Sequence, residues 1–449
     1  MMKYLFLLLI SNCFLQLNAQ YQIGHTTITY IDASRSNRSI ATEIYYPALT
    51  AGNNTTAAAG QFPVIVFGHG FVMAWSSYQN IWEHYTSLGY ILVFPKTESA
   101  LAVDHQNFGW DLQYLVTKIQ DEGQLGSSVL FNAVAPETAL MGHSMGGGSA
   151  FLAADSLSAN GNVNFKTLIG LAPAESSTNG VSSIASAASV TKPSLIFSGS
   201  GDGVTPPIDH HIPMYNGLAS SCKAFVNILG GGHCYFAQTD FFCDFGETAT
   251  IGGVTITRSQ QQQTTYTLLD NWLDYYLRNN CAGKDQFMTD IQTLPGIIGE
   301  TTCSENVLPV ISENSGNLVS SVSGTSYQWY YEGNVISNSN SISILPTLTG
   351  NYTVEVTYAD GCIRLSTIYV YTIVGLEEFT NSYSISPNPT NGIVTIKTNS
   401  PEVLTVELVD VFGKFITSIK TSDTIDISFL NNGIYFLSIE GIKYRIIKN

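Results

Sequence analysis

Gly142-His143-Ser144-Met145-Gly146 decides the fold of this chain. It follows a short apolar stretch, Thr138 to Met141, and precedes a run of small residues from Gly147 that is typical of a helix start. A G-x-S-x-G sequence between a strand and a helix predicts a sharp turn that exposes the serine hydroxyl. The flanking glycines are needed because a side chain there would collide with the neighbouring strand or helix. Short matches also occur by chance, so the surrounding residues decide what the turn means.

Two further residues complete a nucleophilic constellation around Ser144. A serine hydroxyl becomes a good nucleophile only when a base takes its proton, and a carboxylate orients that base. Asp202 follows the apolar strand Pro193 to Ser198, and His233 follows the alternating strand Ala224 to Leu229. Both therefore lie at carboxyl ends of predicted parallel strands, where sites in open α/β sheets gather. We predict Ser144 as nucleophile, His233 as base and Asp202 as the orienting acid.

A second loop is predicted to stabilise negative charge at the same edge of the sheet. The strand Pro63 to Phe67 runs into Gly68-His69-Gly70-Phe71. This position is that of the loop which donates one backbone N–H to an oxyanion hole, and the other donor follows the nucleophile. We therefore predict that the N–H groups of Phe71 and Met145 bind the oxyanion.

Other polar residues near these motifs receive structural interpretations. His69 and His143 are expected to support the site by packing or hydrogen bonding. Glu98 and Asp104 follow the strand Tyr90 to Phe94 and are expected to be solvated loop charges rather than substrate contacts. No spacing of cysteine, histidine or carboxylate matches a zinc signature, so we predict neither a metal nor a cofactor.

Composition limits the class of protein and its partners. A chain of 449 residues exceeds one ordinary domain, so two or three are expected. Its 34 acidic and 18 basic residues give a net charge of -16. Nucleic acids and anionic membrane surfaces both demand basic patches, so neither is an expected partner. We expect a monomer.

The amino-terminal segment has the form of a secretory signal. Lys3 supplies its positive charge, Tyr4 to Ile10 its apolar core, and Leu17-Asn18-Ala19 a cleavage site. The apolar run is too short to anchor the chain in a membrane. The predicted organisation is a signal peptide (1–19), an α/β domain with a mostly parallel, doubly wound sheet (20–303), an Ig-like β-sandwich (304–375) and a second small β-sandwich domain (376–449).

Removing the signal also removes Cys13 and leaves six of the seven cysteines, which suits disulfides in an exported protein. Six cysteines allow 15 connectivities. Cys234 and Cys243 flank one loop and are expected to pair locally. Cys222 begins the strand before that loop, and an amphipathic helix from Thr264 to Leu277 would return Cys281 to it. We therefore also predict the pairs Cys222–Cys281 and Cys303–Cys362.

The chain changes character after Cys281. Short alternating strands, including Tyr327 to Tyr330 and Gly350 to Val356, predict the Ig-like sandwich. Within it, Trp329 is expected to be buried and to face the strand of Tyr352, in preference to binding carbohydrate.

A third unit begins near Tyr383 with Ser386-Pro387-Asn388-Pro389-Thr390-Asn391-Gly392. Its later motifs are Leu430-Asn431-Asn432-Gly433-Ile434-Tyr435 and the basic strand Tyr444 to Lys448. These residues resemble the carboxy-terminal sorting domain of type IX secretion in Bacteroidota. The resemblance implies interaction with that secretion machinery, export across the outer membrane, removal of the domain and attachment to the cell surface.

The amino-terminal domain resembles secreted α/β-hydrolase esterases of the dienelactone hydrolase, chlorophyllase and polyester hydrolase group. The residues that carry the resemblance are Phe67 to Phe71, Gly142 to Gly147, Leu171-Ala172-Pro173, Asp202 with Pro206, and Gly231-Gly232-His233. The resemblance implies ester hydrolysis through Ser144, His233 and Asp202. It also implies that Phe71 takes the place of an aromatic residue that contacts aromatic acyl groups.

One departure from that group bears on the substrate. Hydrolases of poly(ethylene terephthalate) carry tryptophan after the Ala-Pro pair, where this chain has Ala174 followed by Glu175. Trp75, Trp82 or Phe236 could supply aromatic surface instead, although core packing is the default interpretation of each. Our predicted substrate-binding residues are Phe71, Trp75, Ala174 and Glu175, and cleavage of terephthalate polyesters is left open.

Two other classes of function stay open. One is a different hydrolase on the same residues, such as a lipase, a phospholipid acetylhydrolase or a peptidase. The other is a non-catalytic surface adhesin that binds through its sandwich. The complete set of nucleophile, base and acid favours an enzyme, because an adhesin has no need of all three.

Overall fold

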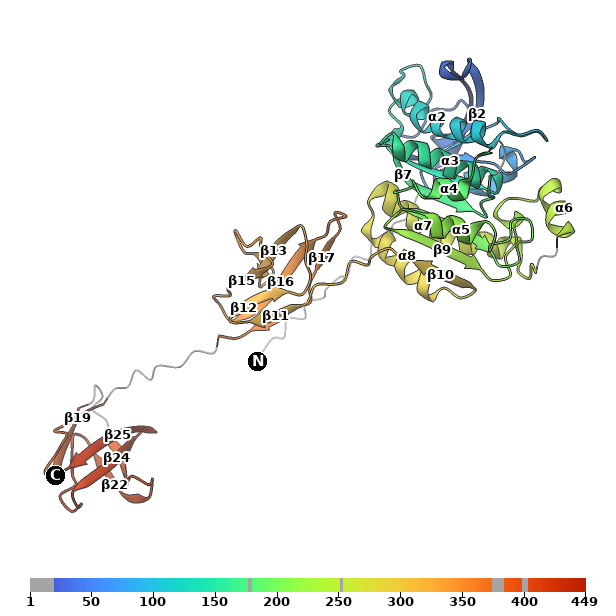
Figure 1. Cartoon of the computed structure of the whole chain (residues 1–449). Coiled ribbons are helices and arrows are strands. Elements are labelled where there is room, and N and C mark those ends of the chain that lie inside the picture. Colours follow the sequence, from blue (N-terminus) through green and yellow to red (C-terminus); the bar gives the residue numbers. More distant parts are fainter. Residues whose placement is uncertain (1–19, 177–179, 251–252, 374–382, 398–402) are drawn as a thin grey trace, which may run out of the picture. The chain divides into compact units, whose positions relative to one another are not determined.

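The computed structural model describes residues 20–176, 180–250, 253–373, 383–397 and 403–449 (Figure 1). The predicted signal peptide lies outside these residues. The chain divides into two compact units, the first made of Met1–Leu345 with Asn351–Tyr369 and the second of Pro346–Gly350 with Val370–Asn449. The domain boundaries expected at residues 303 and 375 stay predictions.

A ten-stranded sheet organises the first unit, in the order β10-β9-β8-β7-β6-β4-β5-β2-β1-β3 (Figure 1). The run from β9 to β5 is parallel, whereas β2 and β10 join it antiparallel. The strands are Gln22–Asp32 (β1), Arg38–Ala48 (β2), Gly52–Asn53 (β3), Phe62–Gly68 (β4), Ile91–Pro95 (β5), Val134–His143 (β6), Phe165–Leu171 (β7), Ser194–Gly199 (β8), Lys223–Ile228 (β9) and Ile297–Thr301 (β10).

Helices cover both faces of this sheet, so the predicted doubly wound α/β fold is confirmed. Buried side chains of α2 to α5 pack on one face, and those of α1, α7 and α8 pack on the other. The helices are Gln79–Ser87 (α1), His105–Gln124 (α2), Met145–Ala159 (α3), Ser183–Ala187 (α4), His211–Gly217 (α5), Phe241–Ala249 (α6), Arg258–Arg278 (α7) and Cys281–Thr293 (α8), with short 3-10 turns at Ala33–Arg35 (η1), Trp75–Tyr78 (η2) and Cys234–Phe236 (η4).

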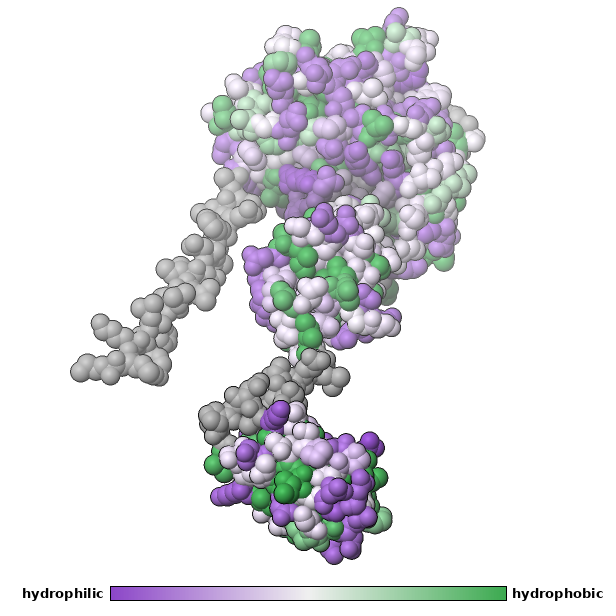
Figure 2. Space-filling view, turned by 90° about the vertical axis from the view of Figure 1, so that its left-hand side faces the viewer, coloured by the Kyte–Doolittle hydropathy of each residue, from purple (hydrophilic) through white to green (hydrophobic). Residues whose placement is uncertain are grey.

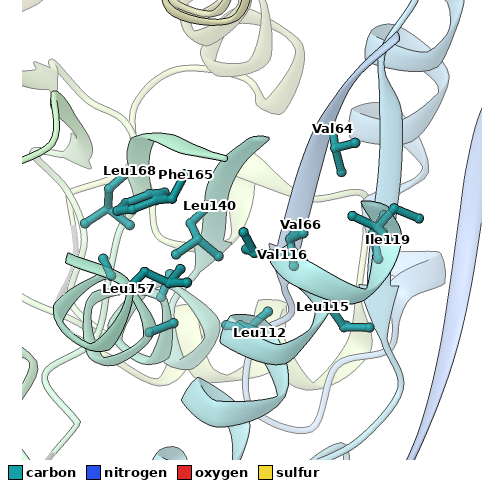
Figure 3. Close-up of a cluster of buried hydrophobic side chains, with 14 of the residues drawn as sticks. Val64, Val66, Leu112, Leu115, Val116, Ile119, Leu140, Leu157, Phe165 and Leu168 are labelled. Atoms are coloured by element: carbon teal, nitrogen blue, oxygen red, sulfur yellow. The ribbon is translucent and has the colours of Figure 1, made fainter. Parts of the chain in front are cut away.

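Strand β4 shows why the sequences of the central strands are continuously apolar. Val64 and Val66 point into the cluster under α2 and α3 (Figure 3), while Ile65 and Phe67 point into the opposite cluster. All four are fully buried, because successive side chains of a strand alternate between faces and both faces are covered. The carboxyl end of β4 is thereby held beside that of β6, where the glycine-flanked serine lies.

The structure corrects the expectation that Glu98 and Asp104 are solvated charges. Glu98 forms an ion pair with Arg38 at 2.8 Å and accepts the backbone N–H of Asp104 at 2.6 Å. The Asp104 carboxylate accepts the N–H of Asn107 at 2.9 Å and caps α2. A capping carboxylate satisfies a donor that the helix leaves unpaired, so both residues are structural.

The disulfides confirm one predicted pair and overturn two. Cys234 is bonded to Cys243, as expected. Cys222 is bonded to Cys303 and Cys281 to Cys362, so the predicted pairs Cys222–Cys281 and Cys303–Cys362 are wrong. The reason is β10, a strand that the sequence did not reveal. It pairs antiparallel with β9 and brings the chain back beside Cys222, which leaves Cys281 for the sandwich.

Small antiparallel sheets follow, in agreement with the predicted fold class. In the first unit, Trp329 is fully buried and its neighbour Tyr331 pairs with Tyr352 across the sheet, so packing accounts for Trp329. The strands of these sheets are Ile311–Asn314 (β11), Asn317–Ser320 (β12), Ser326–Tyr331 (β13), Asn334–Val335 (β14), Ser343–Ile344 (β15), Gly350–Thr357 (β16), Ile363–Leu365 (β17) and Tyr369–Tyr371 (β18).

The second unit holds two more antiparallel sheets around its own apolar cluster. Its strands are Ser384–Ser386 (β19), Ile393–Lys397 (β20), Leu404–Val409 (β21), Phe415–Thr421 (β22), Thr424–Asp426 (β23), Gly433–Ile439 (β24) and Ile442–Lys448 (β25). Hydrophilic and hydrophobic residues are interspersed over the face shown in Figure 2. Among the described residues, none of the helices has the length and apolar character needed to cross a membrane.

Candidate active site

Ser144 sits at a strained turn between β6 and α3. Its φ of 54° and ψ of -123° lie where residues other than glycine are rarely found. The two flanking glycines allow the turn, because a Cβ on Gly142 would lie 2.3 Å from the Gly146 carbonyl oxygen. A Cβ on Gly146 would lie 2.2 Å from the Gly68 backbone at the end of β4. The predicted collisions are therefore present on both sides of the serine.

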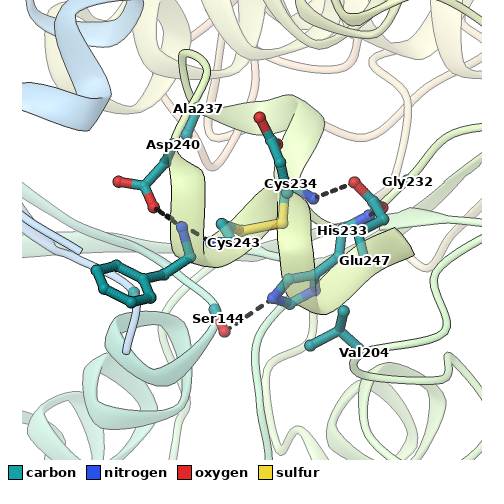
Figure 4. Close-up of a disulfide and its surroundings, with 12 residues drawn as sticks. Ser144, Val204, Gly232, His233, Cys234, Ala237, Asp240, Cys243 and Glu247 are labelled. Atoms are coloured by element: carbon teal, nitrogen blue, oxygen red, sulfur yellow. Dashed lines mark hydrogen bonds between the residues drawn. A yellow bond between two sulfur atoms is a disulfide. The ribbon is translucent and has the colours of Figure 1, made fainter. Parts of the chain in front are cut away.

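The structure brings Ser144, His233 and Asp202 into one hydrogen-bonded line. His233 Nε2 lies 2.9 Å from Ser144 Oγ (Figure 4), and His233 Nδ1 lies 2.8 Å from Asp202 Oδ2. A carboxylate only accepts hydrogen bonds, so Nδ1 carries the proton and Nε2 is free to accept one from the serine. All three residues are buried, Ser144 being the most exposed at 8%. The arrangement can take a proton from the serine hydroxyl.

Asp202 is held ionised by the loop in which it lies. Its Oδ1 accepts the N–H groups of Val204 at 2.9 Å and Thr205 at 2.8 Å, and the Thr205 hydroxyl donates to Oδ2 at 2.9 Å. Burial raises the pKa of Asp202, but the charge and hydrogen bond of His233 and the backbone hydrogen bond from Thr205 outweigh it and lower that pKa below its ordinary value. The carboxylate therefore stays charged beside the imidazole.

A buried chain of hydrogen bonds joins the three loops of the site. The Tyr78 hydroxyl accepts the N–H of Gly70 at 2.7 Å and lies 2.8 Å from His143 Nδ1. His143 Nε2 lies 2.9 Å from the carbonyl oxygen of His233. That oxygen can only accept, so Nε2 of His143 is protonated and Nδ1 accepts from Tyr78. Burial lowers the pKa of His143 to about 3, which keeps it neutral and fixes it as a support.

Glu247 of α6 reaches the back of His233. Its carboxylate accepts the backbone N–H of His233 and, at 3.2 Å, that of Cys234. Glu247 is buried, and burial raises its pKa because the charged form loses hydration. The Cys234–Cys243 disulfide ties the same helix to the same loop (Figure 4).

The predicted oxyanion and substrate residues differ in exposure and in their contacts, and their roles stay predictions. Met145 is the first residue of α3, where backbone N–H groups lack helical partners. Phe71 is 46% exposed. The N–H of Ala174 donates to the Ser144 carbonyl oxygen at 2.8 Å, which puts Ala174 beside the nucleophile. The Glu175 carboxylate accepts the N–H of Ile184 at 2.8 Å.

The tryptophans and Phe236 have structural contacts of their own. Trp75 donates from Nε1 to the Tyr45 hydroxyl at 3.1 Å, and Trp82 stacks on Tyr45 with ring centroids 4.1 Å apart. Phe236 is buried at 1% exposure. Trp82 and Phe236 are therefore packing residues, and a substrate contact by Trp75 stays a prediction.

Sequence reasoning missed four residues of this site, namely Thr205, His211, Tyr78 and Glu247. His211 is fully buried, with Nδ1 2.8 Å from Ser198 Oγ and Nε2 3.1 Å from Thr205 Oγ1. An aspartate in a turn commonly accepts hydrogen bonds from residues that follow it closely, so the contact of Asp202 with Thr205 could have been predicted. The other three residues make contacts between different helices, strands and loops, so no short sequence pattern predicts them.

Comparison with known proteins shows the family of this chain. Residues 17–249, more than half of the chain, match the family described as PET hydrolase-like. The chain belongs to the PET hydrolase-like family. This is an esterase family, and its match includes Ser144, Asp202 and His233. Residues 384–449 match the secretion system C-terminal sorting domain, which marks the protein for secretion and the cell surface.

Individual relatives of this PET hydrolase-like protein cover only part of it. Chlorophyllase-1 of Arabidopsis thaliana is 32% identical over 117 residues, which are 26% of this chain and 36% of that protein. Bis(hydroxyethyl) terephthalate hydrolase of Streptomyces coelicolor is 27% identical over 194 residues, 42% of this chain and 54% of that protein. The chain thus spans about a third to a half of the length of these relatives.

Proposed function

We propose that the protein is a secreted serine carboxylic-ester hydrolase that works through an acyl-enzyme. One observation carries the proposal: the Ser144 hydroxyl lies 2.9 Å from His233 Nε2, while Nδ1 of the same ring lies 2.8 Å from Asp202. This geometry matches the roles of nucleophile, base and orienting acid. Family membership supports the same class of reaction.

In the first half-reaction, Ser144 Oγ attacks the ester carbonyl carbon as its proton passes to His233 Nε2. Asp202 stabilises the imidazolium that forms. The carbonyl oxygen gains negative charge and is bound by the N–H groups of Phe71 and Met145. Because these donors are already in place, no free energy is needed to reorient them during the reaction. His233 then donates its proton to the departing alkoxide, and the alcohol leaves.

The second half-reaction repeats these roles with water. His233 takes a proton from water, the resulting hydroxide attacks the acyl carbon, and the acid leaves as the Ser144 oxygen regains its proton. The buried chain through Tyr78 and His143 holds the His233 backbone, so the ring can accept and return the proton without losing its place.

The substrates that we propose are aromatic or polymeric esters. The relative in Streptomyces coelicolor, a bis(hydroxyethyl) terephthalate hydrolase, supports this class. The exposed ring of Phe71 can contact an aromatic acyl group, and Ala174, whose N–H donates to the Ser144 carbonyl oxygen, puts only a short side chain beside the nucleophile. A lipase or phospholipid acetylhydrolase would use the same residues with a preference for long or short acyl chains.

The test is hydrolysis of p-nitrophenyl esters from acetate to palmitate and of bis(hydroxyethyl) terephthalate by the full chain. Ser144→Ala should lower kcat by at least about a thousandfold, with the melting temperature unchanged. Ser158→Ala, on the same helix, is the matched control and should retain full activity. Full turnover by Ser144→Ala would overturn the proposal, and the chain-length profile would separate esterase from lipase.

A further inference from the structure

Helix α6 carries three exposed phenylalanines close together on one short helix. Phe241, Phe242 and Phe245 are 76%, 59% and 65% exposed. Their rings touch one another, with centroids of Phe241 and Phe242 5.4 Å apart and those of Phe241 and Phe245 6.4 Å apart. Exposed rings of this size add up to roughly 400 Å² of apolar surface. An apolar patch of that area is often functional.

The rings stand on a helix that is firmly attached at its opposite side. Cys243 is bonded to Cys234, and Asp244 forms an ion pair with Arg258. Glu247 accepts the backbone N–H of His233. At 3.6 residues per turn, these three residues fall on one side of α6 and the three phenylalanines on the other. One side of the helix therefore faces the protein, and the other exposes the rings. A helix held in this way keeps its apolar face exposed instead of folding it inward.

The helix that carries the rings adjoins the active site. The amino-terminal cap of α6, Asp240, accepts the Ser77 hydroxyl at 2.7 Å, and Ser77 belongs to η2, which follows the predicted oxyanion loop. From the other side, α6 is joined to the His233 loop by the disulfide (Figure 4). The helix therefore spans the two loops that flank Ser144, at the periphery of the first unit (Figure 1).

Charge favours a neutral occupant for this face. Helices that lie on membranes are rich in lysine and arginine on their polar side, whereas α6 contains Asp244 and Glu247 and no basic residue. The net charge of the chain, -16, also opposes an anionic lipid surface. A neutral hydrophobic solid needs no basic residues on the helix and is not repelled by the negative charge of the chain. If the solid is aromatic, its rings can also stack on those of the helix.

We propose that α6 is a docking surface for a water-insoluble ester, and that Phe241, Phe242 and Phe245 adsorb the enzyme on the solid beside the bond to be cut. The proposal rests on the proposed function for its substrate class. It assigns the three phenylalanines to binding of the solid and not to the chemical step, so dissolved esters should not depend on them.

The test compares the full chain with the triple variant Phe241→Gln, Phe242→Gln, Phe245→Gln on an amorphous poly(ethylene terephthalate) film and on a polycaprolactone film. We expect adsorption and product release from both films to fall at least fivefold. Turnover of dissolved p-nitrophenyl acetate, which reports an intact site, should stay within twofold. A triple tyrosine variant, which keeps the rings, should retain adsorption.

The matched control is Leu125→Gln, Phe131→Gln, Val163→Gln. These residues are also exposed, but they precede β6 and β7 and so lie at the amino ends of the parallel strands, away from Ser144. The control should adsorb as the unmodified chain does. Equal loss in the control, or full adsorption by the phenylalanine variant, would overturn the docking proposal and leave the ester hydrolase standing.

Two further outcomes would also overturn it. If sedimentation shows a dimer that the phenylalanine variant converts to monomer, the occupant of the face is a second copy of the chain. If the variant loses binding to phosphatidylcholine vesicles but keeps its affinity for the films, the occupant is a lipid surface. Absence of turnover on every dissolved ester would instead contradict the proposed function, since adsorption is measured separately.

Discussion

The carboxylate of Glu247 accepts the backbone N–H of His233, so helix α6 holds the proposed catalytic base from behind. The contact also explains the glycine before the histidine, because a Cβ on Gly232 would lie 2.2 Å from Glu247 Oε1. Cys234 is fixed by the same carboxylate and by its disulfide. The base is thus positioned by its neighbours as well as by Asp202.

Replacing Glu247 with alanine should weaken both stability and catalysis. Two buried N–H groups would lose their acceptor, and each costs about 1–3 kcal/mol of unfolding free energy. A shift of the His233 loop should also lower kcat about tenfold or more, since small misplacements of a catalytic group are costly. Urea unfolding and p-nitrophenyl butyrate turnover measure the two effects. Glu313→Ala, on an exposed residue of β11, is the control, and equal behaviour of both variants would show that the contact is dispensable.

The buried histidines predict loss of stability in mild acid. Burial lowers the pKa of His143 and of His211 to about 3, whereas the unfolded chain titrates near pH 6.5. Between these values the unfolded state binds protons that the folded state refuses, so the free energy of unfolding falls as the pH drops. We expect the melting temperature to decline from pH 7 to pH 4.

The matching variant is His211→Gln, which removes one of the two groups. Its stability at pH 7 should be lower, because Ser198 and Thr205 lose a partner. Its dependence on pH should be shallower by about 1.4 kcal/mol per pH unit, the contribution of one proton. Thr167→Ala, which removes a buried hydroxyl that does not titrate in this range, should leave the slope unchanged. A slope that His211→Gln also leaves unchanged would contradict this account.

Much of this site could be predicted from sequence because strand ends are local features. Apolar runs followed by glycine-rich turns located Ser144, Asp202 and His233, and the structure brings these residues within hydrogen-bonding distance. The alternating pattern from Gly350 to Val356 likewise matches β16. In each case the residues that define the element are neighbours in the chain.

What could not be predicted depends on contacts between distant segments. Strand β10, with the sequence Ile297-Ile298-Gly299-Glu300-Thr301, has exposed residues and a glycine, so its pattern was weak. It is a strand because it pairs with the edge of β9. That pairing brings Cys303 next to Cys222, which is why two of the predicted disulfides were wrong. A glutamate such as Glu247 is expected from its sequence to be exposed. It is buried only because α6 packs against the His233 loop.

The residue after the Ala-Pro pair should govern preference for aromatic acids. Ala174 lies next to Ser144, since its N–H donates to the Ser144 carbonyl oxygen. Ala174→Trp would add a ring against which an aromatic acyl group can stack, a contact worth about 0.5–1.5 kcal/mol. We expect kcat/KM for bis(hydroxyethyl) terephthalate to rise about two- to tenfold relative to p-nitrophenyl acetate. Ala174→Leu adds bulk without a ring and should not change the ratio, so an equal rise in both variants would exclude stacking.

The two disulfides of the α/β domain should differ in what they protect. Cys222–Cys303 and Cys234–Cys243 join residues 81 and 9 apart in sequence. By loop entropy, their removal should cost about 4.5 and 2.6 kcal/mol of unfolding free energy. The double variant Cys222→Ser, Cys303→Ser should therefore have the lower melting temperature. It should retain kcat, because the bond that it removes holds β10 at the edge of the sheet. Cys234→Ser, Cys243→Ser should lose less stability and more activity, because it frees the loop of His233. Melting curves and p-nitrophenyl butyrate kinetics on both double variants decide this, and the reverse ranking of activity would show that the local disulfide does not position the base.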